Sequence, residues 1–324
     1  MAPITYLEAI RAALWEEMER DERVFLLGED IGVYGGAFKV TDGFLDRFGK
    51  ERVVDTTISE AGIVGAAIGA ALAGLRPVAE MQFIDFIANG FNLVTNWAAK
   101  CRWRWGQSVP LVIRGPSGGY VRGGPFHSQN VEAFFFHTPG LKIVYPSTAA
   151  DAKGLLLAAI RDPDPVLYFE HKYLYRRARG DVPAGSDATP IGKAATRREG
   201  DDVSVITYGA TVAMALEAAE EMSREGVSVE VVDLRTLRPF DEESILATAR
   251  KTGKVLVLHE DHLTGGVGAE VAARIAEKAF DHLDGPVARV AALDAPVPYA
   301  GALEDRVLPD RARVVDALRR LAAY

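Results

Sequence analysis

The sequence is poor in cysteine and in uninterrupted apolar stretches. Cys101 is its one cysteine, so the chain has no intrachain disulfide and no cysteine cluster for zinc. No stretch reaches the roughly 20 apolar residues of a membrane span, and residues 1–21 show no basic run followed by an apolar core. We therefore expect a reducing compartment, either the cytoplasm or, for a mature eukaryotic form, the mitochondrial matrix.

An excess of positive charge is also missing. The net charge is −8, whereas a nucleic-acid partner requires a basic surface, so an anionic cofactor would need a local site. Two glycine-rich segments, Gly28–Gly32 and Thr264–Gly268, follow predicted strands but match neither the dinucleotide fingerprint nor a P-loop. For the second segment we favour a tight turn into a helix, with nucleotide binding as the alternative.

What is present is the composition of a folded protein, with 48% hydrophobic and 25% charged residues. A length of 324 residues suggests two domains at about 150 residues each. Helical and β-rich segments alternate, which predicts an α/β fold of two three-layer αβα domains with mainly parallel sheets. We expect the domains at 1–185 and 203–324, joined by an exposed linker at 186–202 that is rich in Gly, Pro, Ser and charge.

The individual elements are predicted from periodicity and capping signals. Thr5 and Glu8 form a capping box for a first helix that ends near Asp21. Helices are also expected at Val212–Arg224 and Asp241–Lys251. The predicted strands are Val24–Leu27, Arg76–Met81, Val109–Ile113, Lys142–Tyr145, Val166–Phe169, Val203–Thr207, Val227–Val232 and Lys254–His259.

The segment Ile58-Ser59-Glu60 draws attention because a strand ends there and Ser59 is suited to cap the following helix. Glu60 then lies in the first turn, where most carboxylates merely answer the helix dipole. The next residues, Ala61–Ala73, are crowded with alanine and glycine, which predicts close packing and a buried helix. A glutamate at the mouth of a buried helix is a candidate for proton chemistry.

Several motifs, weak one by one, occur together in order along nearly the whole chain. They resemble the β subunits of the thiamine-diphosphate-dependent 2-oxo acid dehydrogenases. The resemblance implies a transketolase-like pyrimidine-binding domain followed by a transketolase C-terminal-like domain. The motifs are Gly28–Asp30, Ile58–Gly62, Gly74–Pro77, His127–Gln129, Asp151–Leu155, Tyr208–Ala210 and Val231–Thr236.

This resemblance implies that Glu60 hydrogen-bonds the aminopyrimidine ring of thiamine diphosphate and that His127 assists reductive acylation of a lipoyl group. For His127 the alternative is a solvated loop histidine, and for the aromatic residues the alternative is an ordinary core position. The implied cofactor contacts are Glu29, Ile58, Ser59, Glu60, Gln82 and Phe86. The implied substrate contacts are Phe83, Phe86, Phe126 and His127. We assign no metal to His259 or His262.

The Gly-Asp-Gly and Asn-Asn segments by which such enzymes bind the metal on the diphosphate are missing. By resemblance, an α subunit would hold Mg²⁺ and share the cofactor in an α2β2 heterotetramer. The family also implies a potassium ion bound largely by backbone carbonyls. The matching positions are Leu111, Ala159, Ile160, Asp162 and Asp164, although Pro163 and Pro165 depart from the commoner loop.

Substrate and partner choices stay open at this point. The motifs look closer to branched-chain enzymes than to pyruvate dehydrogenases, with acetoin as a third choice. A transketolase or a deoxyxylulose-phosphate synthase would need a much longer chain, and a non-catalytic scaffold subunit is the alternative of a different class. The C-terminal domain is expected to dock the lipoyl-bearing acyltransferase core, with contacts from Asp294 and Tyr324.

Overall fold

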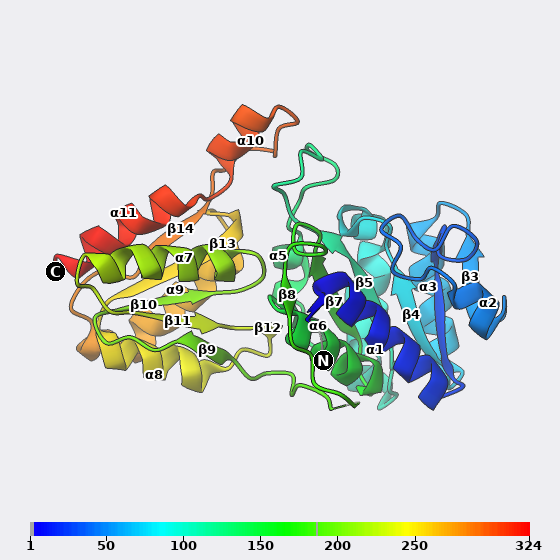
Figure 1. Ribbon diagram of the computed structural model, residues 1–324. Coiled ribbons are helices and arrows are strands. Elements are labelled where there is room, and N and C mark those ends of the chain that lie inside the picture. The colour runs from blue at the N-terminus through cyan, green and yellow to red at the C-terminus, as the bar shows by residue number, and fades with distance from the viewer. Residues whose placement is uncertain (1–2, 186) are drawn as a thin grey trace. The chain divides into compact units, whose positions relative to one another are not determined.

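The structure is a computed structural model that describes residues 3–185 and 187–324 (Figure 1). The chain forms two compact units: the first comprises Met1–Ser117 and Phe134–Ile191, the second Gly118–Ala133 and Gly192–Tyr324. The stretch 118–133 thus belongs to the second unit. The predicted linker begins at Ser186, which lies outside the described residues, and it contains the strand β9 (Ala195–Arg198) of the second unit.

The first unit is built on a parallel sheet, as the alternation of elements predicts. Its strand order is β6-β7-β5-β4-β2-β3, and every neighbouring pair is parallel. The strand predicted at Val109 starts three residues later because Pro110 has no N–H for the ladder. The strands are β2 (Val24–Glu29), β3 (Val53–Thr56), β4 (Arg76–Glu80), β5 (Val112–Ser117), β6 (Lys142–Val144) and β7 (Val166–His171).

Helices cover this sheet, and their starts follow the predicted signals in part. The predicted capping box is confirmed: the Thr5 hydroxyl accepts the Glu8 N–H at 3.1 Å, and the Glu8 carboxylate accepts the Thr5 N–H at 2.6 Å. Short β1 (Ile4–Thr5) pairs antiparallel with β8 (Arg179–Gly180). The helices are α1 (Tyr6–Arg20), α2 (Phe44–Phe48), α3 (Glu60–Leu72), α4 (Cys101–Trp105), α5 (Glu132–Phe136) and α6 (Ala149–Arg161).

A buried ion network crosses the middle of this sheet. Arg114 of β5 is 1% exposed and contacts the carboxylates of Glu80 on β4 and Glu170 on β7. The Arg114 Nη2 to Glu170 Oε2 distance is 2.7 Å, and the Tyr175 hydroxyl donates to the same oxygen at 2.7 Å. Every buried charge here has a partner, so the network links three strands and leaves no charge of its three members unpaired.

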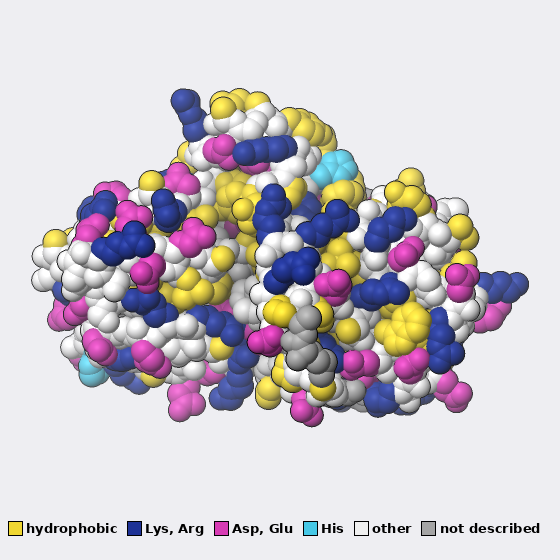
Figure 2. Space-filling model, in the orientation of Figure 1, with side chains coloured by type: hydrophobic (Ala, Val, Ile, Leu, Met, Phe, Trp, Pro, Cys, Tyr) yellow, Lys and Arg dark blue, Asp and Glu magenta, His cyan; other side chains and the backbone are white. Residues whose placement is uncertain are grey.

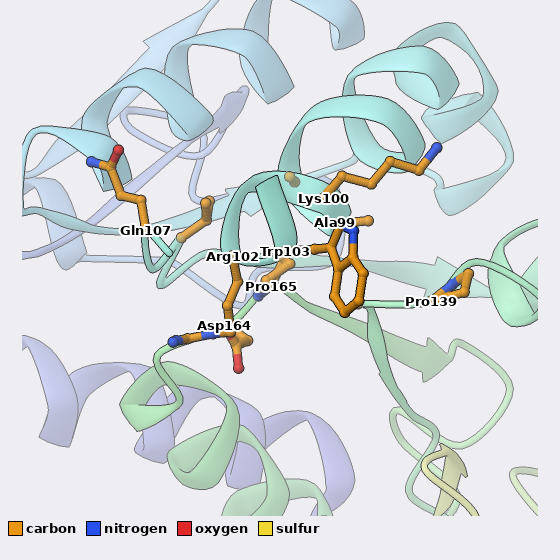
Figure 3. A pocket seen from close by; sticks show the side chains of 11 residues that line it. Ala99, Lys100, Arg102, Trp103, Gln107, Pro139, Asp164 and Pro165 are labelled. Atoms are coloured by element: carbon orange, nitrogen blue, oxygen red, sulfur yellow. The ribbon is translucent and has the colours of Figure 1, made fainter. Parts of the chain in front are cut away.

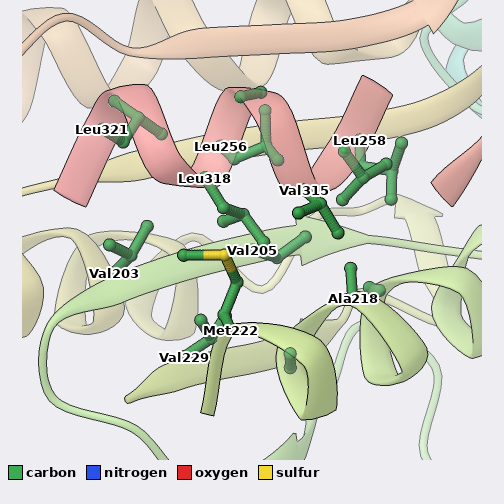
Figure 4. Close-up of a cluster of buried hydrophobic side chains, with 14 of the residues drawn as sticks. Val203, Val205, Ala218, Met222, Val229, Leu256, Leu258, Val315, Leu318 and Leu321 are labelled. Atoms are coloured by element: carbon green, nitrogen blue, oxygen red, sulfur yellow. The ribbon is translucent and has the colours of Figure 1, made fainter. Parts of the chain in front are cut away.

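The second unit is a three-layer αβα arrangement. The strand order is β14-β13-β10-β11-β9, parallel except for β9. Side chains of β10 alternate: Val203 and Val205 pack in a core with α7 and α11 (Figure 4), whereas Ser204 hydrogen-bonds Thr248 and Thr252 of α8. The elements are β10 (Val203–Thr207), α7 (Thr211–Arg224), β11 (Val229–Asp233), β12 (Thr236–Arg238), α8 (Glu242–Thr252), β13 (Val255–His262), α9 (Val267–Lys278), β14 (Ala288–Ala292), α10 (Gly301–Val307) and α11 (Arg311–Ala322).

The surface is charged with both signs intermixed, and hydrophobic side chains lie between the charges on the face drawn in Figure 2. Asp and Glu side chains lie among the Lys and Arg side chains on that face. Among the described residues, no helix combines the length and apolar character that a membrane span requires.

Candidate active site

Most of the predicted cofactor residues lie where three neighbouring strands of the first unit end. Glu29 is the last residue of β2, Ile58–Glu60 follow β3, and Gln82 and Phe83 follow β4. These strands are adjacent and parallel, so their carboxyl ends meet at one edge of the sheet. Ligands of open parallel sheets bind at this edge.

Glu60 is the first residue of α3 and is only 8% exposed. Its Oε2 accepts a hydrogen bond from the side-chain amide of Asn89 at 2.9 Å. Asn89 lies in the 3₁₀ helix Ile84–Gly90, and no sequence signal pointed to it. Ile58 is 82% exposed, so its side chain is available to a ligand or a partner chain.

The prediction that the Ser59 side chain caps α3 is wrong. Ser59 occupies the N-cap position, but its hydroxyl makes no capping hydrogen bond, because its backbone angles of φ −165° and ψ 75° turn it elsewhere. The hydroxyl oxygen lies 2.7 Å from where a Cβ on Gly62 would stand. A side chain at position 62 is therefore excluded unless Ser59 moves.

Glu29 is the strongest sign of an incomplete site. The side chain is 6% exposed, it accepts a hydrogen bond from the Ser59 backbone, and its Oε1 has no hydrogen-bond partner among the described residues. Burial raises the pKa of the Glu29 carboxyl, and the carboxyl groups of Glu60 and Asp30 raise it further. A buried unpaired oxygen beside a second carboxyl group fits a ligand that supplies hydrogen-bond donors, as an aminopyrimidine ring does.

The prediction that the alanine- and glycine-rich helix is buried is only half right. One face of α3 is buried, including Ile63, Val64, Ala67 and Ile68. The other face is exposed, and a Cβ on Gly69 would meet nothing within 4 Å. Apart from Gly62, whose missing side chain leaves room for Ser59, glycine is not required by packing inside the described chain at an exposed position such as Gly69.

The residues after β4 form a half-buried aromatic surface. Gln82 donates to the Asp30 carboxylate at 3.1 Å, and Phe83 packs edge-on against Phe38 with ring centroids 5.7 Å apart. Phe83 and Phe86 are both half-buried, which is less covered than an ordinary core position. Gln82 is thereby tied to the segment that follows Glu29.

His127 belongs to the second unit, whereas Glu60 belongs to the first. The stretch 118–130 forms a loop whose first residue donates its N–H to the Gln129 carbonyl at 3.0 Å. Phe126 is 62% exposed. Within its own unit, the loop presents a histidine next to an exposed aromatic side chain.

Four of the five predicted potassium positions, Leu111, Ala159, Ile160 and Asp162, have carbonyls that already accept hydrogen bonds. Arg76 Nη1 donates to the Ile160 carbonyl at 2.7 Å and to the Asp162 carbonyl at 3.3 Å. The Ala159 carbonyl accepts the Asp162 N–H at 3.3 Å, and the Leu111 carbonyl accepts an N–H at 2.9 Å. A guanidinium thus stands on two of the carbonyls that a cation would use, so these residues fit a second positive charge poorly.

The remaining predicted positions lie in the second unit. Asp294 accepts two hydrogen bonds from Thr264, at 3.0 and 2.6 Å, which lower the pKa of its carboxyl. Tyr324 is 67% exposed. His259 is fully buried, and Cβ atoms added at Gly266 and Gly268 would collide with its ring, so the glycine-rich turn is required for packing around this imidazole. In the described chain, no group of three or more His, Cys, Asp or Glu residues could hold a metal.

A cavity lies in the first unit away from these residues (Figure 3). It measures about 780 Å³, and Trp103, Arg102, Lys100 and Pro139 are among its lining residues. Asp164 alone joins it to the predicted positions. Because it contains none of the predicted catalytic or cofactor residues, its size is no reason to move the site there.

Comparisons with known proteins assign the chain to a family. Residues 2–178 match the transketolase pyrimidine binding domain, and residues 192–314 match the transketolase C-terminal domain. The 2-oxoisovalerate dehydrogenase subunit beta of Bacillus subtilis (strain 168) is 52% identical over 100% of both chains. The chain belongs to the β subunits of the 2-oxo acid dehydrogenases.

Other members of this family are similar over nearly the whole chain. The pyruvate dehydrogenase E1 component subunit beta of Staphylococcus aureus (strain COL) is 44% identical over 100% of both chains. That of Rhizobium meliloti (strain 1021) is 44% identical over 98% of this chain and 70% of its own. A solved structure of a split-gene transketolase, an inactive β4 tetramer, superposes with a TM-score of 0.81 at 25% identity, covering 99% of this chain and 98% of the other. The predicted resemblance and fold class are confirmed.

Proposed function

We propose that this chain, together with an α subunit, decarboxylates a branched-chain 2-oxo acid and passes the acyl group to the lipoyl group of an acyltransferase core. The observation that carries the proposal is the pair of buried carboxyl groups at the sheet edge, Glu60 and Glu29, one of which has an unpaired oxygen. The 52% identity to a 2-oxoisovalerate dehydrogenase subunit beta supports the substrate class.

Each residue of the sheet edge has a role in this proposal. Bound thiamine diphosphate would supply the nucleophilic carbon and the electron sink for decarboxylation. Asn89 orients the Glu60 carboxyl through Oε2, so Oε1 is the atom that holds and exchanges a proton with the pyrimidine ring. Glu29 has little exposure to water and offers its unpaired Oε1 to a donor on the ligand. Half-buried Gln82 and Phe86 follow β4 and are assigned to the cofactor. In the second unit, exposed Phe126 beside His127 suits an aliphatic substrate.

We assign the diphosphate and its Mg²⁺ to the α subunit, in an α2β2 heterotetramer. The chain carries no Gly-Asp-Gly and Asn-Asn pair, and two phosphates without a cation would be electrostatically unfavourable in a closed site. The similar split-gene transketolase is inactive as a β4 tetramer, which supports a requirement for the second chain. The exposed small-residue face of α3 fits a closely packed partner.

The potassium ion, the docking of the core and the compartment are separate parts of the proposal. The Arg76 guanidinium occupies the Ile160 carbonyl that the ion would use. If the melting temperature is equal in KCl and NaCl, the potassium ion is to be dropped from the proposal. For core docking, exposed Tyr324 remains available, whereas Asp294 is held by Thr264. A single, buried cysteine supports the cytoplasm or the mitochondrial matrix.

The test is steady-state turnover with the co-expressed α subunit. We expect kcat/KM for 3-methyl-2-oxobutanoate to exceed that for pyruvate by at least about 10- to 200-fold, the range that a single methylene in an apolar pocket supplies. Glu60→Ala should abolish decarboxylation, and the exposed Glu51→Ala serves as the matched control. A preference for pyruvate, which the 44% identical relatives make the second candidate, would reassign the substrate. Decarboxylation that survives Glu60→Ala contradicts the assigned role, and no turnover with any 2-oxo acid would leave a scaffold subunit.

A further inference from the structure

The loop that carries His127 is closed upon itself in the second unit. The Gly118 N–H donates to the Gln129 carbonyl at 3.0 Å and forms a neck. Near the tip, the His127 N–H donates to the Gly124 carbonyl at 3.3 Å. The histidine is therefore presented from a defined turn, whose position depends on what holds the rest of the loop.

The backbone of this loop is strained. Tyr120 and Arg122 are not glycine, yet both have a φ of 62° in the left-handed region. Residues in this region persist only where surrounding contacts over-determine them. The loop must therefore be held from outside, and the Tyr120 hydroxyl, which donates to the Pro309 carbonyl at 2.9 Å, is one such contact.

A single buried carboxylate oxygen ties both ends of the loop to the sheet of the second unit. Glu260 lies in β13 and is 5% exposed. Its Oε1 accepts the Gly119 N–H at 2.6 Å and the Asn130 side-chain amide at 2.8 Å. These donors lie at the beginning and the end of the loop, so one acceptor fixes the separation and orientation of both stems.

A second carboxylate holds the middle of the loop. Glu304 of α10 is 0% exposed. Its Oε1 accepts the Arg122 N–H at 3.2 Å, and its Oε2 accepts the Arg122 guanidinium at 2.5 Å. Arg122 also contacts exposed Asp305 at 2.6 Å. Arg122, one of the two residues with a left-handed backbone, is thus held at both its main chain and its side chain.

We propose that Glu260 and Glu304 are positioning residues for His127, acting through the loop and not on the substrate. The inference rests on the proposed function, because it assumes that His127 takes part in the transfer to the lipoyl group. Two buried acids from separate elements fix the stems and the middle of a strained loop, so the imidazole does not have to be ordered at the moment of transfer. The proton exchange that starts decarboxylation is assigned to Glu60 of the first unit, and neither Glu260 nor Glu304 takes part in it.

The experiment compares Glu260→Ala, Glu260→Gln and the exposed control Glu277→Ala in the assembled enzyme. One measurement is hydrogen–deuterium exchange over residues 118–130. The other is the ratio of two rates: decarboxylation with an artificial electron acceptor, and reductive acylation of a free lipoyl domain. We expect Glu260→Ala to accelerate loop exchange and to slow acylation by about 10- to 100-fold. Decarboxylation at saturating 2-oxo acid should be much less affected, because Phe126 and His127 of the loop serve that step only as substrate contacts. Glu260→Gln keeps an acceptor oxygen for both donors and should restore most of the acylation rate.

Two results would overturn the inference: loop exchange that does not change in Glu260→Ala, or both rates falling together. If Glu260→Ala does not fold, Asn130→Ala removes one of the two hydrogen bonds and should give the same pattern at a smaller size. Absence of decarboxylation in the unmodified enzyme would instead refute the proposed function. In that case the exchange measurement still decides whether Glu260 holds the loop.

Discussion

Two pairs of buried carboxylates, Glu29 and Glu60 in the first unit and Glu260 and Glu304 in the second, differ in how much of their hydrogen-bonding capacity the protein itself uses. In the first unit, Glu29 keeps an unpaired oxygen, and Glu60 has one side-chain amide on it. In the second unit, Glu260 and Glu304 each accept two hydrogen bonds from one loop. Because a buried polar group is costly unless paired, the first pair indicates a ligand site and the second pair indicates a scaffold.

The largest effect on activity should come from removing the acidic proton of Glu60, one member of the pair that we assign to the ligand. Glu60→Gln keeps the shape of the side chain and an acceptor for Asn89, but it has no exchangeable acid. We expect decarboxylation to fall by about 10²- to 10⁴-fold, while the free energy of unfolding changes by less than about 1 kcal/mol. Carbon dioxide release and urea unfolding measure the two quantities. If Glu60→Gln lowers the free energy of unfolding by several kcal/mol as well as the activity, Glu60 has a structural role like that of Glu260 and Glu304. The contrast between the two pairs would then be wrong.

An internally satisfied charge should behave in the opposite way. Arg114→Met leaves Glu80 and Glu170 without their buried partner, so we expect the free energy of unfolding to fall by about 3–5 kcal/mol. Arg320→Met is the control, because Arg320 pairs with Asp316 on the exposed face of α11 and should cost at most about 0.5 kcal/mol. Urea unfolding at pH 7 distinguishes them. If the two variants lose the same free energy of unfolding, burial does not account for the contribution of the Arg114 network to stability.

The second unit should lose stability in acid. Burial lowers the pKa of His259 from 6.5 to about 4, so between these values the unfolded chain binds a proton that the folded chain does not. Stability should therefore fall as the pH drops through this window, by up to about 3 kcal/mol. His259→Gln should flatten the profile of melting temperature against pH, whereas exposed His282→Gln should not. A profile unchanged by His259→Gln would exclude this imidazole as its cause.

The smallest effect should have the opposite sign. The pKa of Glu29 is raised by its burial and by Glu60, so above the ordinary value of 4.5 the folded chain holds a proton that the unfolded chain has lost. This contribution to stability falls as the pH rises through the folded pKa. Glu29→Gln should remove that slope, and Glu60→Gln should weaken it by removing the neighbouring charge. Melting curves from pH 4.5 to 7 would show this, and a slope of the same sign as that of His259 would contradict it.

Periodicity along the chain was sufficient for the framework of the fold. The strand predicted at Val203–Thr207 has those bounds in the structure, because a buried parallel strand appears in a sequence as a short segment in which β-branched residues predominate. The position of Glu60 at the start of a helix could likewise be predicted from the neighbouring residues alone. The capping role given to Ser59 failed because a cap depends on backbone angles that residue type does not determine.

The contacts that define the candidate site were not accessible in the same way. Asn89 is 29 residues from Glu60, and Glu260 is 141 residues from Gly119. Neither pair is a spacing that a helix or a strand creates, so only the folded chain brings the two groups together. The exposed half of α3 was missed for a related reason, since composition alone does not tell whether small residues pack within the chain or outside it.

The assignment of 118–133 to the second unit limits how this protein can be divided. The chain passes from one unit to the other after Ser117, again after Ala133, and a third time after Ile191. A fragment ending at Ile191 would contain the complete sequence of the histidine loop but neither Glu260 nor Glu304. Such a fragment should be cut readily by trypsin after Arg122, so the pyrimidine-binding half cannot be excised with its histidine in working order.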